Sequence, residues 1–253
     1  MENGLKEVNK KKQEQILKLV TNSFYKELKN YGVDASDIVT VSVNLLDHIT
    51  EDKKTDQNGS QYYNDFFTIK KVINRWNKDN TLSFNGVSLK QLQDQHIRPI
   101  AKWLANSDIN QTFIGLMPKE ENRLAEYLLN KPDIRYFAIY HENEHFVGMI
   151  GAENIDHFFR KLEMKKMIGE HQFRGKGIGK SSTFLFLYYV FNIMKFNKVY
   201  IHSLDTNIGN ININSKFGFG LEGILYGEVF INEEYRDVLR MGLLKSTWDN
   251  IFS

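Results

Sequence analysis

The chain has 253 residues, 42% hydrophobic and 25% charged, an ordinary composition for a soluble globular protein with one large domain or two small ones. Its formal net charge of +2 is too small to indicate a nucleic acid or membrane partner, because both attract clustered cations. The lack of cysteine excludes disulfides and thiolate catalysis and suits a reducing cytoplasm, and neither a secretory signal nor a membrane-spanning segment is expected.

The first eighty residues are predicted to be helical. Apolar residues recur at three- and four-residue steps along Leu17–Tyr31, which places them on one face of a helix, and Gly32 is placed to end it. Two further apolar runs, Ile38–Ile49 and Phe66–Trp76, predict a second and a third helix. We therefore assign residues 1–80 to a small helical N-terminal domain, in which no residue carries chemistry that we can identify.

From residue 81 to residue 253 the pattern mixes strands with helices. The expected strands are Val87–Leu92, Tyr136–Tyr140, Phe146–Ile150, Leu162–Gly169 and Lys198–Leu204. The expected helices are Ile97–Leu104, a segment after Pro118 and Lys180–Lys195. A polar turn joins the second and third strands into a hairpin, and a second hairpin turns around Asn232–Glu234. Two hairpins and a strand–helix–strand unit predict an α/β or α+β sheet rather than a helical bundle.

A glycine-rich loop, Gln172–Lys180, lies between the fourth expected strand and the apolar helix. Glycines let such a loop turn tightly and approach a ligand, and free N–H groups at a helix N-terminus attract an anion. Arg174, Lys176 and Lys180 add positive charge. The loop therefore predicts a phosphate or pyrophosphate site, and the alternative is a tight turn with a solvated basic face.

Two other phosphate-binding motifs come close to this loop and fail. A Walker A loop needs a glycine where Arg174 stands, and a dinucleotide fingerprint needs a glycine where Lys180 stands. What remains is an Arg-x-x-Gly-x-Gly pattern made by Arg174, Gly177 and Gly179. This pattern resembles motif A of the GNAT acetyltransferase superfamily, in which successive amides hold the pyrophosphate of coenzyme A.

The flanking segments carry the same resemblance in the right order. Val147–Asp156 resembles the strand and turn before motif A, and Asn207–Phe219 resembles the family's later Asn … Lys-x-Gly-Phe segment. Val229–Leu244 resembles the closing hairpin of the ribosomal-protein and nucleotide-sugar branches. The resemblance implies a GNAT fold for residues 81–253, with a mixed, mostly antiparallel sheet flanked by helices.

The resemblance also implies that acyl-coenzyme A is the donor and that a backbone N–H near Met167 or Ile168 polarises the thioester carbonyl. The implied coenzyme A contacts are Met167, Ile168, Phe173, Arg174, Gly175, Lys176, Gly177, Ile178, Gly179, Lys180, Asn207, Asn210 and Lys216. We expect no metal. The run His141–His145 matches the zinc motif H-E-x-x-H, but it fills a turn between two strands, whereas that motif needs a helix.

The attacking amine must lose a proton, so the site needs a proton acceptor or a water that carries the proton. Glu163 and Glu153 lie on the strands beside the implied donor and are the expected bases, and Asp156, His202 and Glu228 are further candidates. Many family members have a tyrosine that protonates the leaving thiolate, and here Asn214 stands at that position. Asparagine can donate a hydrogen bond to the thiolate but cannot act as an acid.

The acceptor is predicted from aromatic and polar residues near the expected site. The expected acceptor contacts are Tyr226, Glu228, Phe230, Asn154 and His157. The sequence looks closest to the branch that moves acetyl or a short hydroxyacyl group, such as 3-hydroxybutyryl, to nucleotide-linked amino-deoxysugars. Two alternatives stay open, the N-terminal acetylation of a protein such as a ribosomal protein, and coenzyme A binding without turnover. The N-terminal domain could shape the acceptor pocket, mediate a homodimer or recruit a partner.

Overall fold

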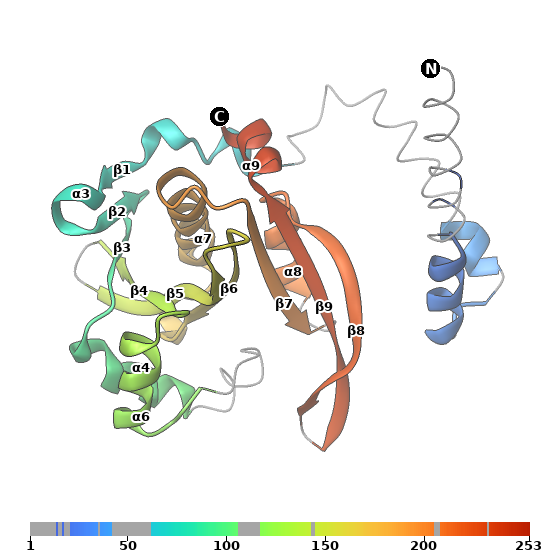
Figure 1. Cartoon of the computed structure of the whole chain (residues 1–253), viewed down its shortest axis with the longest axis horizontal. Helices are drawn as coiled ribbons and strands as arrows, with labels where there is room; N and C mark the ends of the chain where they lie inside the picture. The colour runs from blue at the N-terminus through green and yellow to red at the C-terminus, as the bar shows by residue number, and fades with distance from the viewer. Residues whose placement is uncertain are drawn as a thin grey trace. The chain divides into compact units, whose positions relative to one another are not determined.

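The computed structural model describes residues 14, 17, 21–34, 36–41, 62–105, 117–142, 145–204, 208–231 and 233–253, and among these not the side chains of residues 208 and 209. The chain divides into two compact units, Met1–Gly59 and Ser60–Ser253 (Figure 1). The segment 62–80, which we assigned to the helical N-terminal domain from the sequence, therefore belongs to the second unit. Of the residues predicted above, Asn207, Asn232 and the run 42–49 lie outside the described residues.

The described part of the first unit is helical, as predicted. Residues 21–30 form a helix, and Gly32, with a φ of +75°, lies just beyond its end. The Asp34 carboxylate then accepts hydrogen bonds from the backbone N–H groups of Ser36 and Asp37, at 2.8 and 3.0 Å. These bonds satisfy N–H groups that have no partner within the next helix, which includes residues 36–41.

The second unit is built on a nine-stranded sheet with the strand order β1-β2-β3-β4-β5-β6-β7-β9-β8. Among these described strands, only β6 and β7 run parallel, and the other neighbours are antiparallel. The strands are β1 (Ile73–Arg75), β2 (Thr81–Phe84), β3 (Val87–Gln91), β4 (Arg135–His141), β5 (His145–Asp156), β6 (Lys161–Ile168), β7 (Lys198–Leu204), β8 (Gly220–Ile231) and β9 (Glu234–Leu244). This is the mixed, mostly antiparallel sheet that we expected, and both predicted hairpins are present.

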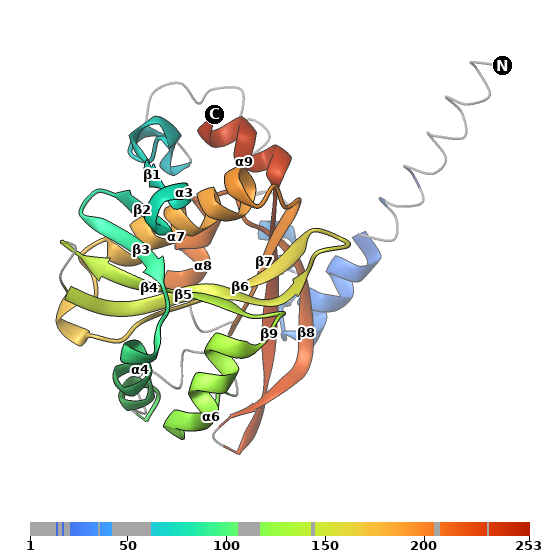
Figure 2. The same cartoon turned by 60° about the vertical axis from the view of Figure 1, so that its left-hand side comes forward.

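The helices flank this sheet (Figure 2). They are α3 (Trp76–Asp79), α4 (Ile97–Leu104), α6 (Glu121–Ala125), α7 (Ile178–Tyr188), α8 (Ile208–Ser215) and α9 (Lys245–Phe252). The π-helical segments Glu126–Asn130 and Tyr189–Ile193 extend α6 and α7, and short 3-10 segments lie at Tyr63–Asp65, Ile69–Lys71, Asp94–His96 and His171–Phe173. Among the described residues, none of the helices has the length and apolar character needed to cross a bilayer.

The helix predicted over Phe66–Trp76 is wrong. A 3-10 turn and the edge strand β1 occupy this segment, and β1 pairs with β2. The reason is tertiary packing, because Phe67 stacks on Phe84 at 5.3 Å and lies 5.0 Å from the ring of Phe184 in α7. The apolar residues of the segment therefore serve the core of the sheet domain rather than one face of a helix.

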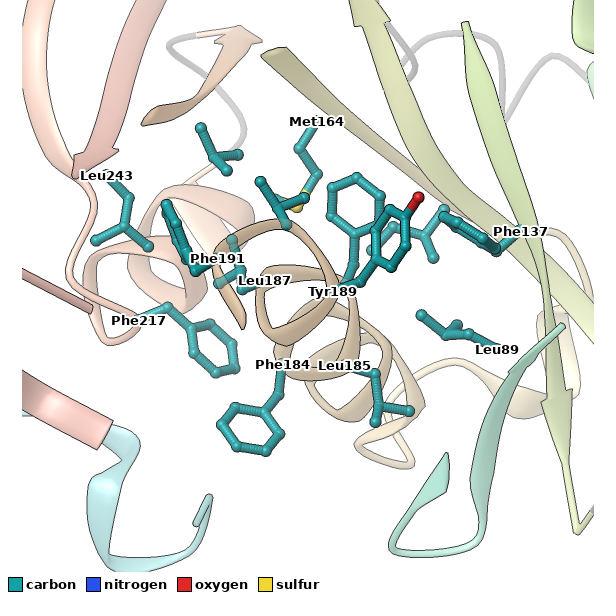
Figure 3. Packing of buried hydrophobic residues seen from close by; sticks show 14 of the residues in the cluster. Leu89, Phe137, Met164, Phe184, Leu185, Leu187, Tyr189, Phe191, Phe217 and Leu243 are labelled. Carbon is teal, nitrogen blue, oxygen red and sulfur yellow. The ribbon is translucent and has the colours of Figure 1, made fainter. Parts of the chain in front are cut away.

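The main core lies between α7 and one face of the sheet (Figure 3). Phe184, Leu185 and Leu187 of α7 are fully buried there, which explains why this helix is apolar all round. Leu162 and Met164 of β6 belong to the same cluster. A second cluster packs α4 and the α6 segment against the opposite face of the sheet. Because side chains alternate along a strand, every second residue of β6 faces away from α7.

The close approach of β5 to β6 depends on Gly148. A Cβ atom at this position would lie 2.2 Å from the carbonyl oxygen of Met167, a backbone atom that cannot rotate away. We therefore expect Gly148→Ala to lower the free energy of unfolding by about 2–3 kcal/mol, as overpacking does. Gly220→Ala is the matched control, since a Cβ there would meet no atom within 4 Å. Equal denaturation midpoints for the two variants would contradict the prediction.

Candidate functional site

The centre of the candidate site is the place where β6 and β7 part. Their parallel pairing covers three residue pairs and ends at Glu163 and Tyr200. Beyond that point β6 continues to pair with β5, and β7 continues to pair with β9 (Figure 1). Within the described part of the chain, the facing edges of β6 and β7 then lack a strand partner. Backbone N–H and C=O groups need partners, so these two edges suit a ligand that carries amide groups.

The glycine-rich loop joins the far end of β6 to α7. Gly175 and Gly177 have φ angles of +76° and +80°, in the left-handed region that favours glycine. A Cβ at either position would meet no atom within 4 Å, so the surface of the loop is open. The Nε of Arg174 donates a hydrogen bond to the carbonyl oxygen of Ile168 at 3.2 Å and holds the loop against β6.

Two lysine side chains project from this loop near aromatic rings. The Lys176 ammonium lies 5.2 Å from the centre of the Phe173 ring, and the Lys180 ammonium lies 5.1 Å from the centre of the Tyr63 ring. Lys216, at the end of α8, lies 5.6 Å from the same Tyr63 ring. Three of the predicted coenzyme A contacts thus gather positive charge at the N-terminus of α7. This charge and the open loop backbone fit a pyrophosphate.

Lys166 lies below the loop, on the face of β6 that α7 covers. Its ammonium donates hydrogen bonds to the hydroxyl of Thr183 at 2.7 Å and to the carbonyl oxygen of Gly179 at 3.2 Å. Burial lowers the pKa of Lys166 to about 8. The sequence analysis missed this residue, because an isolated lysine in a strand has no signature that distinguishes a buried side chain from an exposed one.

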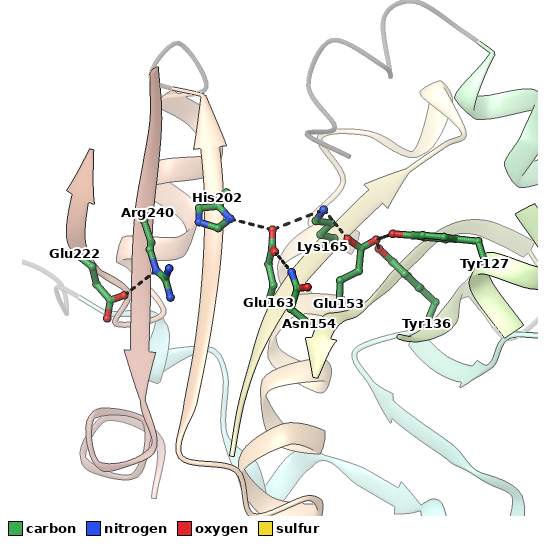
Figure 4. Close-up of polar contacts among 9 residues, drawn as sticks. All are labelled: Tyr127, Tyr136, Glu153, Asn154, Glu163, Lys165, His202, Glu222 and Arg240. Carbon is green, nitrogen blue, oxygen red and sulfur yellow. Dashed lines mark hydrogen bonds and ion pairs between the residues drawn. The ribbon is translucent and has the colours of Figure 1, made fainter. Parts of the chain in front are cut away.

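A buried charged cluster lies on the opposite face of the sheet (Figure 4). Glu153 and Glu163 are direct partners on β5 and β6, and both are nearly inaccessible to solvent. The ammonium of Lys165 lies 2.7 Å from Oε2 of Glu153 and 3.7 Å from Oε1 of Glu163. Since one lysine bridges two carboxylates, the three groups together carry a charge of −1 when all are ionised. A Glu-x-Lys spacing in a strand could have pointed to Lys165, which the sequence analysis also missed.

Glu153 is held by two tyrosines, one from the π-helical segment after α6 and one from β4. Its Oε1 accepts hydrogen bonds from the hydroxyl groups of Tyr127 and Tyr136, at 2.9 and 2.8 Å. Burial, and then the charge of Glu153, raises the pKa of both tyrosines above its ordinary value, so they stay protonated donors. Neither tyrosine was among the predicted site residues.

Glu163 is held from the side of β7. Its Oε1 lies 3.1 Å from Nδ1 of His202, and its Oε2 accepts a hydrogen bond from the Asn154 side chain at 2.9 Å. Burial alone would raise the pKa of Glu163, but the bond from His202, the charge of Lys165 and the bond from Asn154 outweigh it and lower the pKa. Glu163 is therefore ionised at neutral pH, and Asn154 is the one predicted acceptor contact that joins the cluster.

Asn214 lies outside this cluster. It is buried in α8, and its Nδ2 donates to the backbone carbonyl and to the side-chain oxygen of Asn210, at 2.9 and 3.1 Å. Its Oδ1 has no hydrogen-bond partner among the described residues. The structure therefore joins the predicted catalytic residues Glu153 and Glu163 but shows no contact between them and Asn214.

The remaining predicted residues are distributed around the site. Met167 and Ile178 are buried in the core, on opposite faces of the sheet. Tyr226, Glu228 and Phe230 are exposed on β8, and His157 packs its ring against Phe196 at 5.5 Å in the turn after β5. His141 and His145 pair across the ends of β4 and β5, so the helix that a zinc-protease motif requires is absent from this described pair of strands.

Comparison with known proteins agrees with this geometry. The family described as "Acetyltransferase (GNAT) domain" matches residues 87–220. Spermidine N(1)-acetyltransferase of Vibrio cholerae is 32% identical over 117 residues, which are 46% of this chain and 66% of that protein. The Escherichia coli K12 spermidine N(1)-acetyltransferase is 33% identical over 94 residues, 37% of this chain and 50% of that protein. These matches thus span between half and just under two thirds of the relatives' own lengths.

Two further similarities extend the comparison. The putative ribosomal N-acetyltransferase YdaF of Bacillus subtilis is 29% identical over 102 residues, 40% of this chain and 55% of that protein. Among solved structures, spermidine N-acetyltransferase of V. cholerae in complex with CoA and spermine superposes with a TM-score of 0.61 at 25% identity. That match covers 65% of this chain and 99% of the other.

The lowered pKa of Lys166 makes a prediction for stability. The unfolded chain binds this proton more tightly than the folded one, so the free energy of unfolding should rise with pH between about 8 and 10.5. Lys166→Met should remove this contribution and raise the free energy of unfolding at pH 7 by about 1–3 kcal/mol. Lys102→Met, at an exposed position of α4, is the control. Urea denaturation at pH 7, 8, 9 and 10 measures both, and parallel profiles for wild type and Lys166→Met would refute the assignment.

Proposed function

The chain belongs to the acetyltransferase (GNAT) family, and we propose that it is an N-acyltransferase that moves an acetyl or short hydroxyacyl group from coenzyme A to an amine. The observation that supports this most is the position of the basic glycine loop at the far end of β6, beyond the stretch in which β6 and β7 are no longer paired. Coenzyme A combines a pyrophosphate with an arm that carries amide groups. The loop suits the first, and the unpaired strand edges suit the second.

We propose that the backbone and the cations of the glycine-rich loop bind the donor. The amides around Gly175 and Gly177 would hold the pyrophosphate, with Arg174, Lys176 and Lys180 supplying charge. A backbone N–H near Met167 or Ile168 stays the proposed donor to the thioester carbonyl oxygen, and Asn207, Asn210 and Lys216 stay proposed contacts. Bound coenzyme A supplies the thioester whose carbonyl carbon the amine attacks.

The proton of the amine is proposed to leave toward the buried cluster. Glu153 and Glu163 lie on the face of the sheet away from α7, so the amine would approach from that face while the donor is held at the loop. Asn214 stays a proposed hydrogen-bond donor to the leaving thiolate, and its Nδ2 would have to release Asn210 to act. The low basicity of a thiolate lets it leave without a strong acid.

For the acceptor, we propose a nucleotide-linked amino-deoxysugar. Tyr226 and Phe230 expose aromatic surface on β8 that suits stacking on a base or a sugar. Lys165 already bridges the two buried carboxylates, so the three groups offer a polycation a net charge of only −1. A polyamine is the second candidate, favoured by the spermidine N(1)-acetyltransferases among the relatives. A protein N-terminus is the third, favoured by YdaF.

An acceptor panel separates these candidates. The purified chain is incubated with acetyl-coenzyme A or 3-hydroxybutyryl-coenzyme A and with one of three acceptors, a nucleotide-linked amino-deoxysugar, spermidine or a peptide with a free N-terminus. Mass spectrometry should show the acylated sugar nucleotide. Acylated spermidine alone or acylated peptide alone would replace the proposed acceptor with that class. Coenzyme A binding without any product would show a non-catalytic domain.

The loop itself is tested by Gly177→Ala. Alanine adopts a left-handed backbone at a cost of about 1–2 kcal/mol per residue, so the loop should relax away from the conformation that binds the pyrophosphate. We expect the dissociation constant for coenzyme A, measured by calorimetry, to rise about tenfold. Gly220→Ala should bind coenzyme A as the wild type does, because Gly220 has no such φ angle and lies outside the loop. Equal affinities for a folded Gly177→Ala and the wild type would remove the loop from the site.

A further inference from the structure

His202 occupies the point where β6 and β7 have just parted. It lies two residues after Tyr200, the last residue of β7 that pairs with β6. Its neighbours Val199 and Ile201 are buried in the core beside α7, so alternation turns the imidazole to the other face of the sheet. His202 therefore lies on the same side as Glu163 and Lys165, where an amine would approach the strand gap (Figure 4).

The hydrogen bond to Glu163 fixes the state of the imidazole. Glu163 is ionised and can only accept, so Nδ1 of His202 carries the hydrogen and donates it across 3.1 Å. In the neutral ring this leaves a lone pair on Nε2. That atom is buried and has no hydrogen-bond partner among the described residues. Buried polar atoms without partners are rare, and a catalytic role is one reason for a protein to retain one.

The two carboxylates are less available than this nitrogen. Oε1 of Glu153 accepts two tyrosine hydroxyls, and its Oε2 is 2.7 Å from Lys165. Oε2 of Glu163 accepts the Asn154 side chain, and its Oε1 accepts His202. Each carboxylate oxygen in the cluster is thus already bonded, whereas Nε2 of His202 has an unused lone pair. Uptake of one proton there would bring the combined charge of Glu153, Glu163, Lys165 and His202 from −1 to zero.

Among the described residues, the other charged group that faces His202 comes from β9. Arg240 is its direct partner across the β7–β9 pair. The Arg240 guanidinium lies 4.2 Å from the centre of the Tyr200 ring and 3.4 Å from the carboxylate of Glu222, so its charge is balanced on the far side of β7. The Tyr200 ring lies 5.5 Å from the imidazole. Glu163 is therefore the charged group in hydrogen-bond contact with His202.

We propose that Nε2 of His202 accepts the proton of the acceptor amine and that Glu163 is a positioning residue that holds the imidazole in the required tautomer. This inference rests on the proposed function. As the amine nitrogen bonds to the thioester carbonyl carbon, its N–H bond breaks and the proton passes to Nε2. The C–S bond then breaks, and the sulfur leaves as a thiolate with the bonding electron pair. The imidazolium returns the proton to the thiolate or to water.

The test compares His202→Asn and Glu163→Gln with the wild type on the acceptor that the panel identifies. Asparagine at 202 can still donate to Glu163 but cannot accept the proton, so kcat/KM should fall by about 10²–10³ with little change in the KM for acyl-coenzyme A. Glu163→Gln should lower kcat/KM by a smaller factor and leave the KM for acyl-coenzyme A unchanged, because glutamine can still accept the Nδ1 hydrogen but does not offset the charge of the imidazolium. His145→Asn, an exposed histidine at the start of β5, should behave as the wild type.

Two further measurements distinguish a catalytic role of His202 from a structural one. Added imidazole should restore activity to His202→Gly in proportion to the neutral imidazole concentration, which a merely structural role would not allow. Nitrogen-15 NMR of the wild type should show His202 with its hydrogen on Nδ1, and a hydrogen on Nε2 would overturn the proposal without reference to turnover. If the wild type acylates the amine and a folded His202→Asn variant has the same kcat/KM, His202 is not the proton acceptor. The proposed function would still stand in that case. If the wild type acylates no amine, the proposed function falls and takes this role with it.

Discussion

The candidate site depends on one interruption of backbone pairing. β6 and β7 are hydrogen-bonded neighbours as far as Glu163 and Tyr200 and then part, although each keeps its other neighbour (Figure 2). The sheet can tolerate this gap because β5 and β9 continue to satisfy the outer edges of the two strands. A parallel pair needs a crossover helix, and this helix is α7. The connection that creates the parallel pair therefore also brings a helix N-terminus and its loop to the gap.

β6 supplies one lysine to each face of the sheet. Lys165 and Lys166 are consecutive, so the pleat sends them to opposite faces of the sheet. Lys166 donates to the first turns of α7, next to the loop, whereas Lys165 bridges the two buried carboxylates. One side can therefore attract a phosphate while the other keeps a charge balance suited to a single proton. These are separate electrostatic environments, although the two side chains leave adjacent backbone atoms.

The sequence predicted those elements of the structure that depend on local sequence patterns. The glycine loop, both hairpins and α7 follow from turn residues and apolar periodicity, and the described helices of the first unit follow from the same rules. The helix predicted over Phe66–Trp76 is wrong because the apolar spacing of the segment suits a helix, whereas the packing of Phe67 against α7 determines its structure. Lys165, Tyr127 and Tyr136 were missed because they join Glu153 from three elements, and a single sequence does not show which strand residues become partners. Glu153 and Glu163 were predicted individually, but their direct pairing depends on the register of β5 and β6.

Asn214 and His202 concern two linked proton transfers, the delivery of a proton to the leaving thiolate and the removal of a proton from the amine. An amide cannot deliver a proton to a thiolate at ordinary pH, and the Asn214 amide already donates to Asn210. In the proposed reaction, however, the imidazole has become an imidazolium by the time the sulfur leaves. An imidazolium is ordinarily a stronger acid than a thiol, so it can supply the proton that the thiolate takes up. A chain that gains its proton at His202 therefore does not need a tyrosine at position 214.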